Sequence, residues 1–251
     1  MKIIDAVNLR FCIWKLFFKG NISFLQACYL IMPAFLRSEN DVKVKLFDKP
    51  FIVPLGKIGE FHVLMEQIVS LNQYRVGLIR SKSSIFDAGA NLGIFSIYVA
   101  VKYPDSIIYA FEPTPTTFSA LKENVKYYPN IKVFNYALGE AEGNSSIIVM
   151  PNSGSNHIGE GGIPVKIKTI DSTNFKIDFL KIDVEGYEAN VLNGAKETIR
   201  KYKPVIVMSA YHKENDKEEL PRILKGIYPD YVCELNNDGE EVFICTAKDT
   251  K

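Results

Sequence analysis

Residues Ile85 to Gly93 read Ile-Phe-Asp-Ala-Gly-Ala-Asn-Leu-Gly, and residues Tyr109 to Pro113 read Tyr-Ala-Phe-Glu-Pro. The first stretch predicts a short apolar strand that ends in Asp87, a glycine turn and the start of an apolar helix. The second predicts a strand that ends in Glu112, 25 positions after Asp87. In open α/β sheets a ligand binds beyond the carboxyl ends of the strands, and an acid on the second strand binds ribose hydroxyls. The two stretches therefore predict a doubly wound α/β sheet with a nucleoside-containing ligand.

The glycine turn disfavours a dinucleotide. Gly89 and Gly93 are spaced G-x-x-x-G rather than G-x-G-x-x-G. An acid directly before the turn also suits a positively charged ligand better than a pyrophosphate, and the amino group and sulfonium of S-adenosylmethionine fit. We expect Asp87, Gly89, Asn91 and Gly93 to contact the methionine part of this cofactor, Asp87 directly or through water. The alternative role for Asp87 is to cap the following helix.

Five later segments appear in an order typical of one family. They are Ala137-Leu-Gly139, Phe179-Leu-Lys-Ile-Asp-Val-Glu-Gly-Tyr-Glu188, Leu192-Asn-Gly-Ala195, Lys203-Pro-Val-Ile-Val207 and Tyr211-His-Lys213. From about Phe51 to Cys245 the chain resembles the FkbM-type family of S-adenosylmethionine-dependent methyltransferases. The resemblance implies the class I methyltransferase fold and O-methylation, often of sugar, glycolipid or polyketide hydroxyls.

The alternation of apolar segments agrees with that fold. We predict core strands at 84–87, 107–112, 131–135, 178–183 and 204–209, and helices at 91–103, 115–127, 187–201 and 216–226. Two further strands, at 231–235 and 241–245, complete a seven-stranded, mostly parallel Rossmann-like sheet with an antiparallel last hairpin. A hairpin over 42–53 and a helix over 60–74 precede the sheet. We divide the chain into an N-terminal helical and hairpin extension or cap, residues 1–50, and a methyltransferase domain, residues 51–251.

The alternation lapses between the third and fourth core strands. Residues 145–150 and 165–169 predict extra strands around a glycine-rich stretch at 151–162 that we expect to be irregular. Such a loop is either a lid over the ligand or an excursion between two edge strands. His157 lies within it and can reach the substrate only if the loop is a lid.

The composition excludes several classes of protein. A net charge of +1 over 251 residues gives no sign of a nucleic-acid partner. The four cysteines, at 12, 28, 233 and 245, form no CxxC pair, so we expect reduced thiols in a cytoplasmic protein.

The amino terminus is rich in apolar and basic residues. Residues 1–46 hold seven lysines and arginines against three acids, and charges interrupt every apolar run that is long enough to suggest a membrane span or signal peptide. Residues 1–36 either lie on an anionic membrane, at the inner face, or form a cap on the catalytic domain or on a second subunit. We favour the cap. Since the cap can pack on a second subunit, a homo-oligomer is one possible assembly.

Residues at the ends of the second and third strands complete the expected cofactor site. Glu112 can accept two hydrogen bonds from vicinal ribose hydroxyls, and Pro113 follows it in the turn. Tyr136 and Ala137 end the third strand, where the adenine edge is expected. The next acid is Glu140, so the backbone or Asn135 must recognise the adenine.

Three residues are candidates for the chemistry of transfer to a hydroxyl, which needs in-line geometry and a proton acceptor. Asp183 ends the fourth strand, Glu185 follows after one residue, and His212 follows the fifth strand. The carboxylates can act as base, anchor the acceptor or hold a divalent metal, and the sequence assigns no metal site. Imidazole titrates near neutrality, so His212 suits proton abstraction. Capping of the next helix is the structural alternative for Asp183.

The sequence supports a methyltransferase that acts on a hydroxyl of a sugar, glycolipid or related small molecule, with S-adenosylmethionine as cofactor. One rival is a catalytically silent protein of the same fold that scaffolds surface-glycan assembly. A nicotinamide-dependent oxidoreductase is disfavoured by the glycine spacing and by Asp87.

Overall fold

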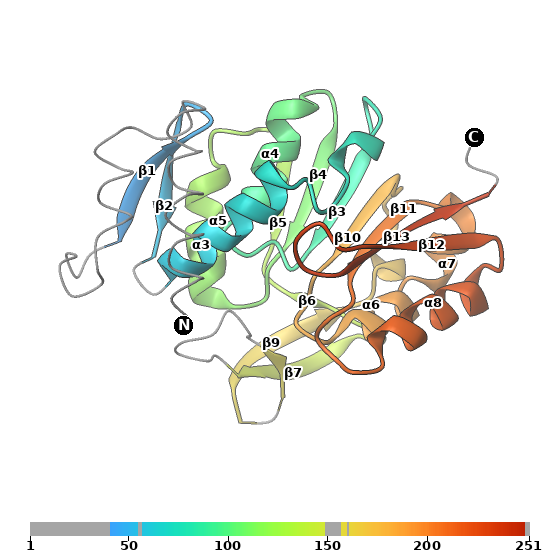
Figure 1. Ribbon diagram of the computed structural model, residues 1–251. Helices are drawn as coiled ribbons and strands as arrows, with labels where there is room; N and C mark the ends of the chain where they lie inside the picture. The colour runs from blue at the N-terminus through green and yellow to red at the C-terminus, as the bar shows by residue number, and fades with distance from the viewer. Residues whose placement is uncertain (1–40, 55–56, 149–156, 160, 249–251) are drawn as a thin grey trace.

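The computed structural model describes residues 41–54, 57–148, 157–159 and 161–248. Its centre is a seven-stranded sheet in the order β12-β13-β11-β10-β3-β4-β5 (Figure 1). The strands are β3 (Ser84–Ala88), β4 (Ile107–Phe111), β5 (Ile131–Phe134), β10 (Phe179–Ile182), β11 (Val205–Ser209), β12 (Tyr231–Asn236) and β13 (Val242–Ala247). The first five are parallel, and β13 is antiparallel to both β11 and β12. This arrangement confirms the predicted Rossmann-like sheet with an antiparallel last hairpin.

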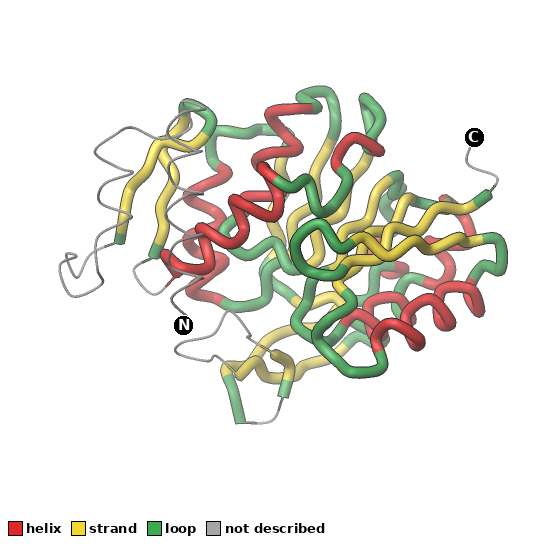
Figure 2. Tube along the Cα trace, in the orientation of Figure 1, coloured by secondary structure: helices red, strands yellow, loops and turns green. Residues whose placement is uncertain are grey.

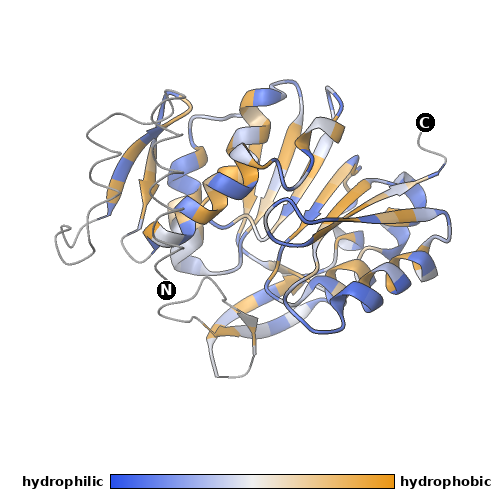
Figure 3. Cartoon of the chain, viewed as in Figure 1, coloured by the Kyte–Doolittle hydropathy of each residue, from blue (hydrophilic) through white to orange (hydrophobic). Residues whose placement is uncertain are grey.

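Helices cover both faces of this sheet (Figures 1 and 2). One face packs against α3 (Ile58–Met65), α4 (Ile94–Lys102) and α5 (Pro115–Val125), and the other against α6 (Glu188–Asn193), α7 (Lys196–Tyr202) and α8 (Asp216–Ile227). Successive strand residues point to opposite faces, so Ile85 joins the first apolar cluster and Phe86 the second. The strands are therefore apolar on both sides, and Figure 3 shows that hydrophobic residues predominate in the strands at the centre of the sheet.

A hairpin, β1 (Val42–Leu46) and β2 (Lys49–Val53), packs beside α5 (Figure 1). The Asn124 side chain of α5 accepts the Ile52 N–H and donates to the Ile52 carbonyl, so it binds the edge strand as a neighbouring strand would. The hairpin spans the predicted boundary at residue 50. Residues 1–40 lie outside the described part of the chain, and the cap stays a prediction. Among the described residues, no helix has the length and apolar character needed to cross a membrane.

A second, four-stranded sheet follows β5, in the order β6-β9-β7-β8. Its strands are β6 (Ala137–Leu138), β7 (Gly143–Ile148), β8 (His157–Ile158) and β9 (Ile163–Lys168). The two predicted extra strands are confirmed in β7 and β9, which pair antiparallel. The expectation that residues 151–162 are wholly irregular is wrong, because β8 pairs with the end of β7. Residues 149–156 and Glu160 lie outside the described residues, so the lid stays a prediction.

Two predicted helices are shorter than expected. The helix predicted over 187–201 is divided into α6 and α7 at Gly194, where a Cβ atom would lie 1.9 Å from the Gly139 carbonyl oxygen. This close contact between distant segments requires glycine and ends α6. The helix predicted over 60–74 begins at Ile58 as α3, and continues as a π-helix only to Ser70.

The expectation of four reduced thiols is wrong for two of them. Cys233 and Cys245 face each other across β12 and β13 and form a disulfide. The register of an antiparallel pair brings residues that are twelve apart in sequence within bonding distance. Cys12 and Cys28 lie outside the described residues.

Candidate active site

A cavity of about 850 Å³ opens at the carboxyl ends of β3, β4, β10 and β11. Predicted site residues that follow these four strands, and two that follow β5, line its wall. They are Gly89, Asn91, Glu112, Pro113, Tyr136, Ala137, Asp183, Glu185 and His212. Their meeting at one edge agrees with the rule that open α/β sheets bind ligands there.

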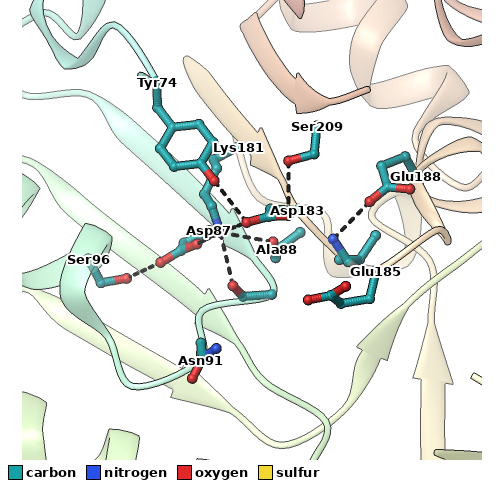
Figure 4. Close-up of polar contacts among 12 residues, drawn as sticks. Tyr74, Asp87, Ala88, Asn91, Ser96, Lys181, Asp183, Glu185, Glu188 and Ser209 are labelled. Carbon is teal, nitrogen blue, oxygen red and sulfur yellow. Dashed lines mark hydrogen bonds and ion pairs between the residues drawn. The ribbon is translucent and has the colours of Figure 1, made fainter. Parts of the chain in front are cut away.

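Asp87 lies beneath this wall rather than in it. Its carboxylate accepts a hydrogen bond of 2.7 Å from the Ser96 hydroxyl and an ion-paired hydrogen bond of 3.0 Å from Lys181 Nζ (Figure 4). Lys181 Nζ also donates to the Gly89 carbonyl at 2.9 Å. Helix α4 begins only at Ile94, so Asp87 does not cap it. The Asp87 side chain is fully buried and does not line the cavity, whereas its partner Lys181 and the turn at Gly89 do. Its contact with the methionine part of the cofactor, direct or through water, stays a prediction.

The two glycines of the turn serve different purposes. Gly89 has a φ of +76°, and a Cβ atom on it would lie 1.9 Å from the Asp183 carbonyl oxygen. It therefore lets the turn after β3 lie directly against the end of β10. Gly93 also has a positive φ, and a Cβ atom there would lie 2.7 Å from Leu121 Cδ1 of α5. Gly93 thus serves the packing of α4 on α5, whereas Gly89 shapes the cavity.

Glu112 is held in place by backbone amides. One carboxylate oxygen accepts the Asn91 N–H at 3.0 Å and the other accepts the Thr114 N–H at 2.9 Å. Burial raises its pKa, although these hydrogen bonds and the charge of Lys57 oppose the rise. The Thr114 side chain also hydrogen-bonds to the carboxylate. Each carboxylate oxygen has two lone pairs, so the carboxylate, which lines the cavity, retains acceptor capacity. This orientation is compatible with the predicted ribose contact.

Asn91 links the turn to α3. It adopts a left-handed conformation with a φ of +50°, and its side-chain amide donates to Glu60. Glu60 is also 2.7 Å from Lys57 Nζ, and both charged residues line the cavity. No local pattern predicts this ion pair, because it depends on how α3 packs against the glycine turn.

Aromatic side chains form the wall at the end of β5. The Tyr136 ring packs against Phe111 and Phe134, with centroids 5.6 and 5.7 Å away. The Asn135 amide donates to the main-chain carbonyls of Glu112 and Pro113. Both of its donor hydrogens therefore hold the turn, and its carbonyl oxygen is the group left for recognition of a ligand.

Asp183 is the centre of a hydrogen-bond network (Figure 4). Oδ2 accepts from the Tyr74 hydroxyl at 2.8 Å, and Oδ1 accepts from the Ser209 hydroxyl at 2.9 Å. Burial acts to raise the pKa of Asp183, but the charges of Lys181 and His212 and the two hydrogen bonds hold it below its usual value. Tyr187 caps α6, so Asp183 does not.

Asp183, Glu185, Glu188 and His212 form what we call the acid–histidine cluster. His212 Nδ1 lies 2.9 Å from Glu188 Oε1, and Nε2 lies 3.3 Å from Glu185 Oε2 and 3.8 Å from Asp183 Oδ1. Burial opposes a charge on His212, but the hydrogen bond and charge of Glu188 and the other acids raise its pKa to about 9. This is above the near-neutral value expected for an unperturbed histidine. Burial and the charge of Asp183 raise the pKa of Glu185 to about 7.

The comparison with known families agrees with this geometry. Residues 87–231, more than half of the chain, match the family described as the methyltransferase FkbM domain. The chain belongs to the FkbM methyltransferase family. The matched range runs from Asp87 at the end of β3 to the start of β12, so it contains the glycine turn, Glu112 and the acid–histidine cluster.

Relatives with this domain come from distant organisms. The hexuronic acid methyltransferase AglP of Haloferax volcanii is 28% identical over 169 residues, which cover 63% of this chain and 68% of AglP. The methyltransferase sdnD of Sordaria araneosa is 24% identical over 209 residues, covering 66% and 81% of the two chains. The 31-O-demethyl-FK506 methyltransferase FkbM of Streptomyces tacrolimicus is 37% identical over 68 residues, about a quarter of each chain.

A solved FkbM structure shares the fold. The methyltransferase FkbM of Methylobacillus flagellatus KT superposes with a TM-score of 0.55 at 19% identity, covering 76% of this chain and 54% of that one. The likeness covers the class I methyltransferase core and confirms the fold class.

Several residues of the FkbM site carry no signal in the sequence. Tyr74 reaches Asp183 from 109 positions away, and Ser209 from 26. Lys181 stands inside the family segment, yet its contact with Asp87 depends on the parallel pairing of β10 with β3, where the two residues are register partners. Glu188 ends one of the family segments, yet its contact with His212 depends on how α6 packs beside the segment after β11.

Proposed function

We propose that this methyltransferase transfers a methyl group from S-adenosylmethionine to a hydroxyl of a sugar, glycolipid or related small molecule. One observation carries the proposal: a single cavity joins the amide-held Glu112 to the acid–histidine cluster. Its volume, about 850 Å³, is sufficient for a cofactor and part of an acceptor. The family of the chain limits the reaction to methyl transfer.

The residues of the cavity fit the proposed cofactor. Glu112 offers a carboxylate, already oriented by two backbone amides, to a pair of ribose hydroxyls. Tyr136 offers an aromatic wall for the adenine, and the turn at Gly89 borders the end of β10. When bound, S-adenosylmethionine supplies an electrophilic methyl group on a sulfonium. The carboxylates around the cavity would stabilise the positive charge of that sulfonium.

The acid–histidine cluster is suited to orient an acceptor hydroxyl and to take its proton. As the hydroxyl oxygen bonds to the methyl carbon, the carbon–sulfur bond breaks and the hydroxyl loses its proton. Asp183 already accepts two hydrogen bonds, so its role is to position the acceptor. Glu185 is the most exposed acid of the cluster, with 32% of its side chain accessible. We assign Glu185 as the proton acceptor, and His212 as the group that holds it in place.

The acceptor class rests on the surroundings of the cluster and on one relative. Ile147 of β7 and Ile158 of β8 line the cavity, so the second sheet forms part of its wall. An apolar wall beside a cluster of acids suits a molecule with both apolar and hydroxyl-bearing parts. The name of AglP states that it methylates hexuronic acid, which supports a glycan acceptor here.

Calorimetry and a labelling assay test the proposal. The protein should bind S-adenosylhomocysteine and should not bind NAD. Extracted host glycans and glycolipids should then acquire label from cofactor carrying a radioactive methyl group. A silent scaffold would bind neither S-adenosylhomocysteine nor NAD, and an oxidoreductase would bind NAD. Either result would overturn the proposal.

A further inference from the structure

Tyr211 places an aromatic ring in the wall of the cavity, beside the acid–histidine cluster. It follows β11, and its ring centroid lies 4.2 Å from that of His212. The residue is 36% exposed and lines the cavity. The proton transfer proposed above makes no use of this ring. An accessible aromatic ring in a cavity wall is a surface against which a ligand can pack.

Glu240 lies beside Tyr211 and comes from the turn between β12 and β13. The pairing of β11 with β13 continues past the end of β11, where the Ala210 N–H donates to the Glu241 carbonyl at 2.9 Å. Glu240 also lines the cavity. Burial and the charges of Asp183 and Glu240 raise the pKa of Tyr211, so its hydroxyl keeps its proton and donates to the Glu240 carboxylate.

The turn that carries Glu240 is held from outside. The Asn236 amide donates to the Gln73 carbonyl at 3.0 Å, and Arg75 Nη2 donates to the Asn236 side-chain oxygen at 2.9 Å. Tyr74, between these two partners in the chain, lines the cavity as well. The turn and the segment beside it therefore form a fixed wall, and a ligand that binds there need not order them first.

This wall matches the two kinds of surface that a pyranose ring presents. The C–H groups of a sugar ring carry partial positive charge and can pack on an aromatic face, which is negative. The hydroxyls of the sugar donate hydrogen bonds, and carboxylates are the stronger acceptors for them. Tyr211 offers the aromatic face, and Glu240 and Glu185 offer carboxylates in the same cavity. A wholly apolar ligand would bury these acids without hydrogen bonds, which is costly.

We propose that Tyr211 and Glu240 form a binding subsite for a pyranose ring of the acceptor. The sugar packs against Tyr211, one of its hydroxyls donates to Glu240, and another reaches the acid–histidine cluster. Glu185 Oε2 lies 3.3 Å from Nε2 of the neighbouring His212, so a sugar on Tyr211 lies beside the proposed proton acceptor. Tyr211 and Glu240 thus determine specificity and take no part in proton transfer. The role of this sugar as methyl acceptor, but not its binding, rests on the proposed function.

Saturation-transfer NMR on the full-length protein, with S-adenosylhomocysteine in excess, tests the subsite without any reaction. The probes are methyl β-D-glucopyranoside, methyl β-D-glucopyranosiduronate and the aromatic diol catechol. At least one of the two glycosides should receive saturation at its ring C–H protons, and a titration gives its dissociation constant. Saturation of catechol but of neither glycoside would assign the wall to an aromatic ligand and overturn the proposal.

Two substitutions of Tyr211 separate the aromatic face from mere apolar bulk. Tyr211→Phe keeps the ring and should bind the glycoside nearly as the parent does. Tyr211→Leu keeps an apolar side chain without the face, and the dissociation constant should rise about tenfold. Tyr127→Leu is the matched control, because Tyr127 is 41% exposed and is not part of the cavity wall. Parental glycoside binding in Tyr211→Leu would overturn the proposal.

Glu240→Gln tests the second half of the subsite. The amide is a weaker acceptor than the carboxylate, so glycoside binding should weaken. Glu241→Gln is its control, because the neighbouring Glu241 pairs with Lys217 at 2.8 Å and does not line the cavity. An equal loss of glycoside affinity in the two variants would refute the role of Glu240.

Calorimetry with S-adenosylhomocysteine separates this proposal from the proposed function. Each variant should keep the parental affinity for S-adenosylhomocysteine, which shows that its cofactor site is folded. A parent protein that binds S-adenosylhomocysteine but neither glycoside would overturn the sugar subsite and leave the proposed function standing.

Discussion

Lys181 Nζ lies 3.0 Å from Asp87 Oδ1 in the centre of the sheet, where the two side chains are 4% and 0% exposed. They are register partners on the parallel strands β10 and β3. Burial opposes the charge on Lys181, but the charges of Asp87 and Asp183 keep its pKa above the usual value. Because Lys181 also donates to the Gly89 carbonyl, this ion pair supports the floor of the cavity.

Removal of the Lys181 charge should destabilise the protein more than removal of a surface charge. Lys181→Met leaves the buried Asp87 carboxylate without its counter-ion, and the cost of such a change is about 3–5 kcal/mol. The free energy of unfolding, measured in urea, should fall by that order. Lys176→Met is the control, because Lys176 pairs with Asp178 at an exposed site and should cost less than about 1 kcal/mol. If the double variant Lys181→Met/Asp87→Asn regains stability, the loss in Lys181→Met is due to the unpaired carboxylate. An equal loss of stability in Lys181→Met and Lys176→Met would refute this account.

Gly89→Ala should be strongly destabilising. The added Cβ atom would lie 1.9 Å from the Asp183 carbonyl oxygen, on a residue whose φ is +76°. Both the clash and the unfavourable backbone conformation must be relieved by movement of the turn away from β10. The melting temperature and the affinity for S-adenosylhomocysteine should fall together. Gly226→Ala in α8 is the matched control, since nothing lies within 4 Å of its Cβ position, and it should stabilise the helix by up to about 1 kcal/mol.

Glu112→Ala should weaken cofactor binding. If the carboxylate accepts two ribose hydroxyls, their loss should cost roughly 1.5–3 kcal/mol, which lowers the affinity at least about tenfold. Calorimetry with S-adenosylhomocysteine measures this, and circular dichroism shows that the variant keeps the parent's overall secondary structure. An unchanged affinity in a folded variant would disprove the ribose assignment. Glu142→Ala, on the exposed surface, should bind like the parent.

Asp183→Asn and His212→Ala should lower kcat more than they lower cofactor affinity. Asp183 is proposed to position the acceptor and His212 to hold the proton acceptor Glu185 in place, so the loss should be seen in turnover and not in the binding of S-adenosylhomocysteine. We expect a reduction in kcat of about 10²-fold or more, the size typical for a group that assists proton transfer. Activity in EDTA measures the metal requirement separately. If His212→Ala turns over at the parental rate, the imidazole takes no part in the reaction.

The amino terminus can be tested with vesicles. If Phe11, Trp14, Phe17 and Phe18 form a protein-facing cap, deletion of residues 1–20 should lower the melting temperature, and the parent should not float with anionic vesicles. A membrane-binding segment would instead float, and salt would weaken the binding because charges are screened within about 10 Å at 0.1 M. Flotation of the parent together with a stable, soluble truncated protein would contradict the cap.

The order of the core elements followed from local patterns. The five parallel strands lie within one or two residues of their predicted ranges, because strands buried on both faces read as short continuous apolar runs. The helix predicted over 187–201 failed for a reason that no local pattern contains. Gly194 must lie against the carbonyl of Gly139, which is far away in sequence.

The site shows the same division. Glu112, Asp183 and His212 were identifiable because each lies just beyond a predicted strand, and strand ends of one parallel sheet meet at one edge. Tyr74, Glu60 and Glu188 were not given roles there, since each depends on how a helix or the loop after it packs against that edge. The disulfide between Cys233 and Cys245 likewise depends on strand register.

By itself, the sequence determined the sheet, the edge of the sheet at which the cavity opens, and the family of the chain, because apolar period and strand-end residues are local properties. Only the tertiary structure decided the charge states within the site. It placed Asp87 beneath the cavity with Lys181, and it surrounded His212 with three acids. Electrostatic energies depend on the distances between groups and on their burial, and both are set by segments that are far apart in the chain.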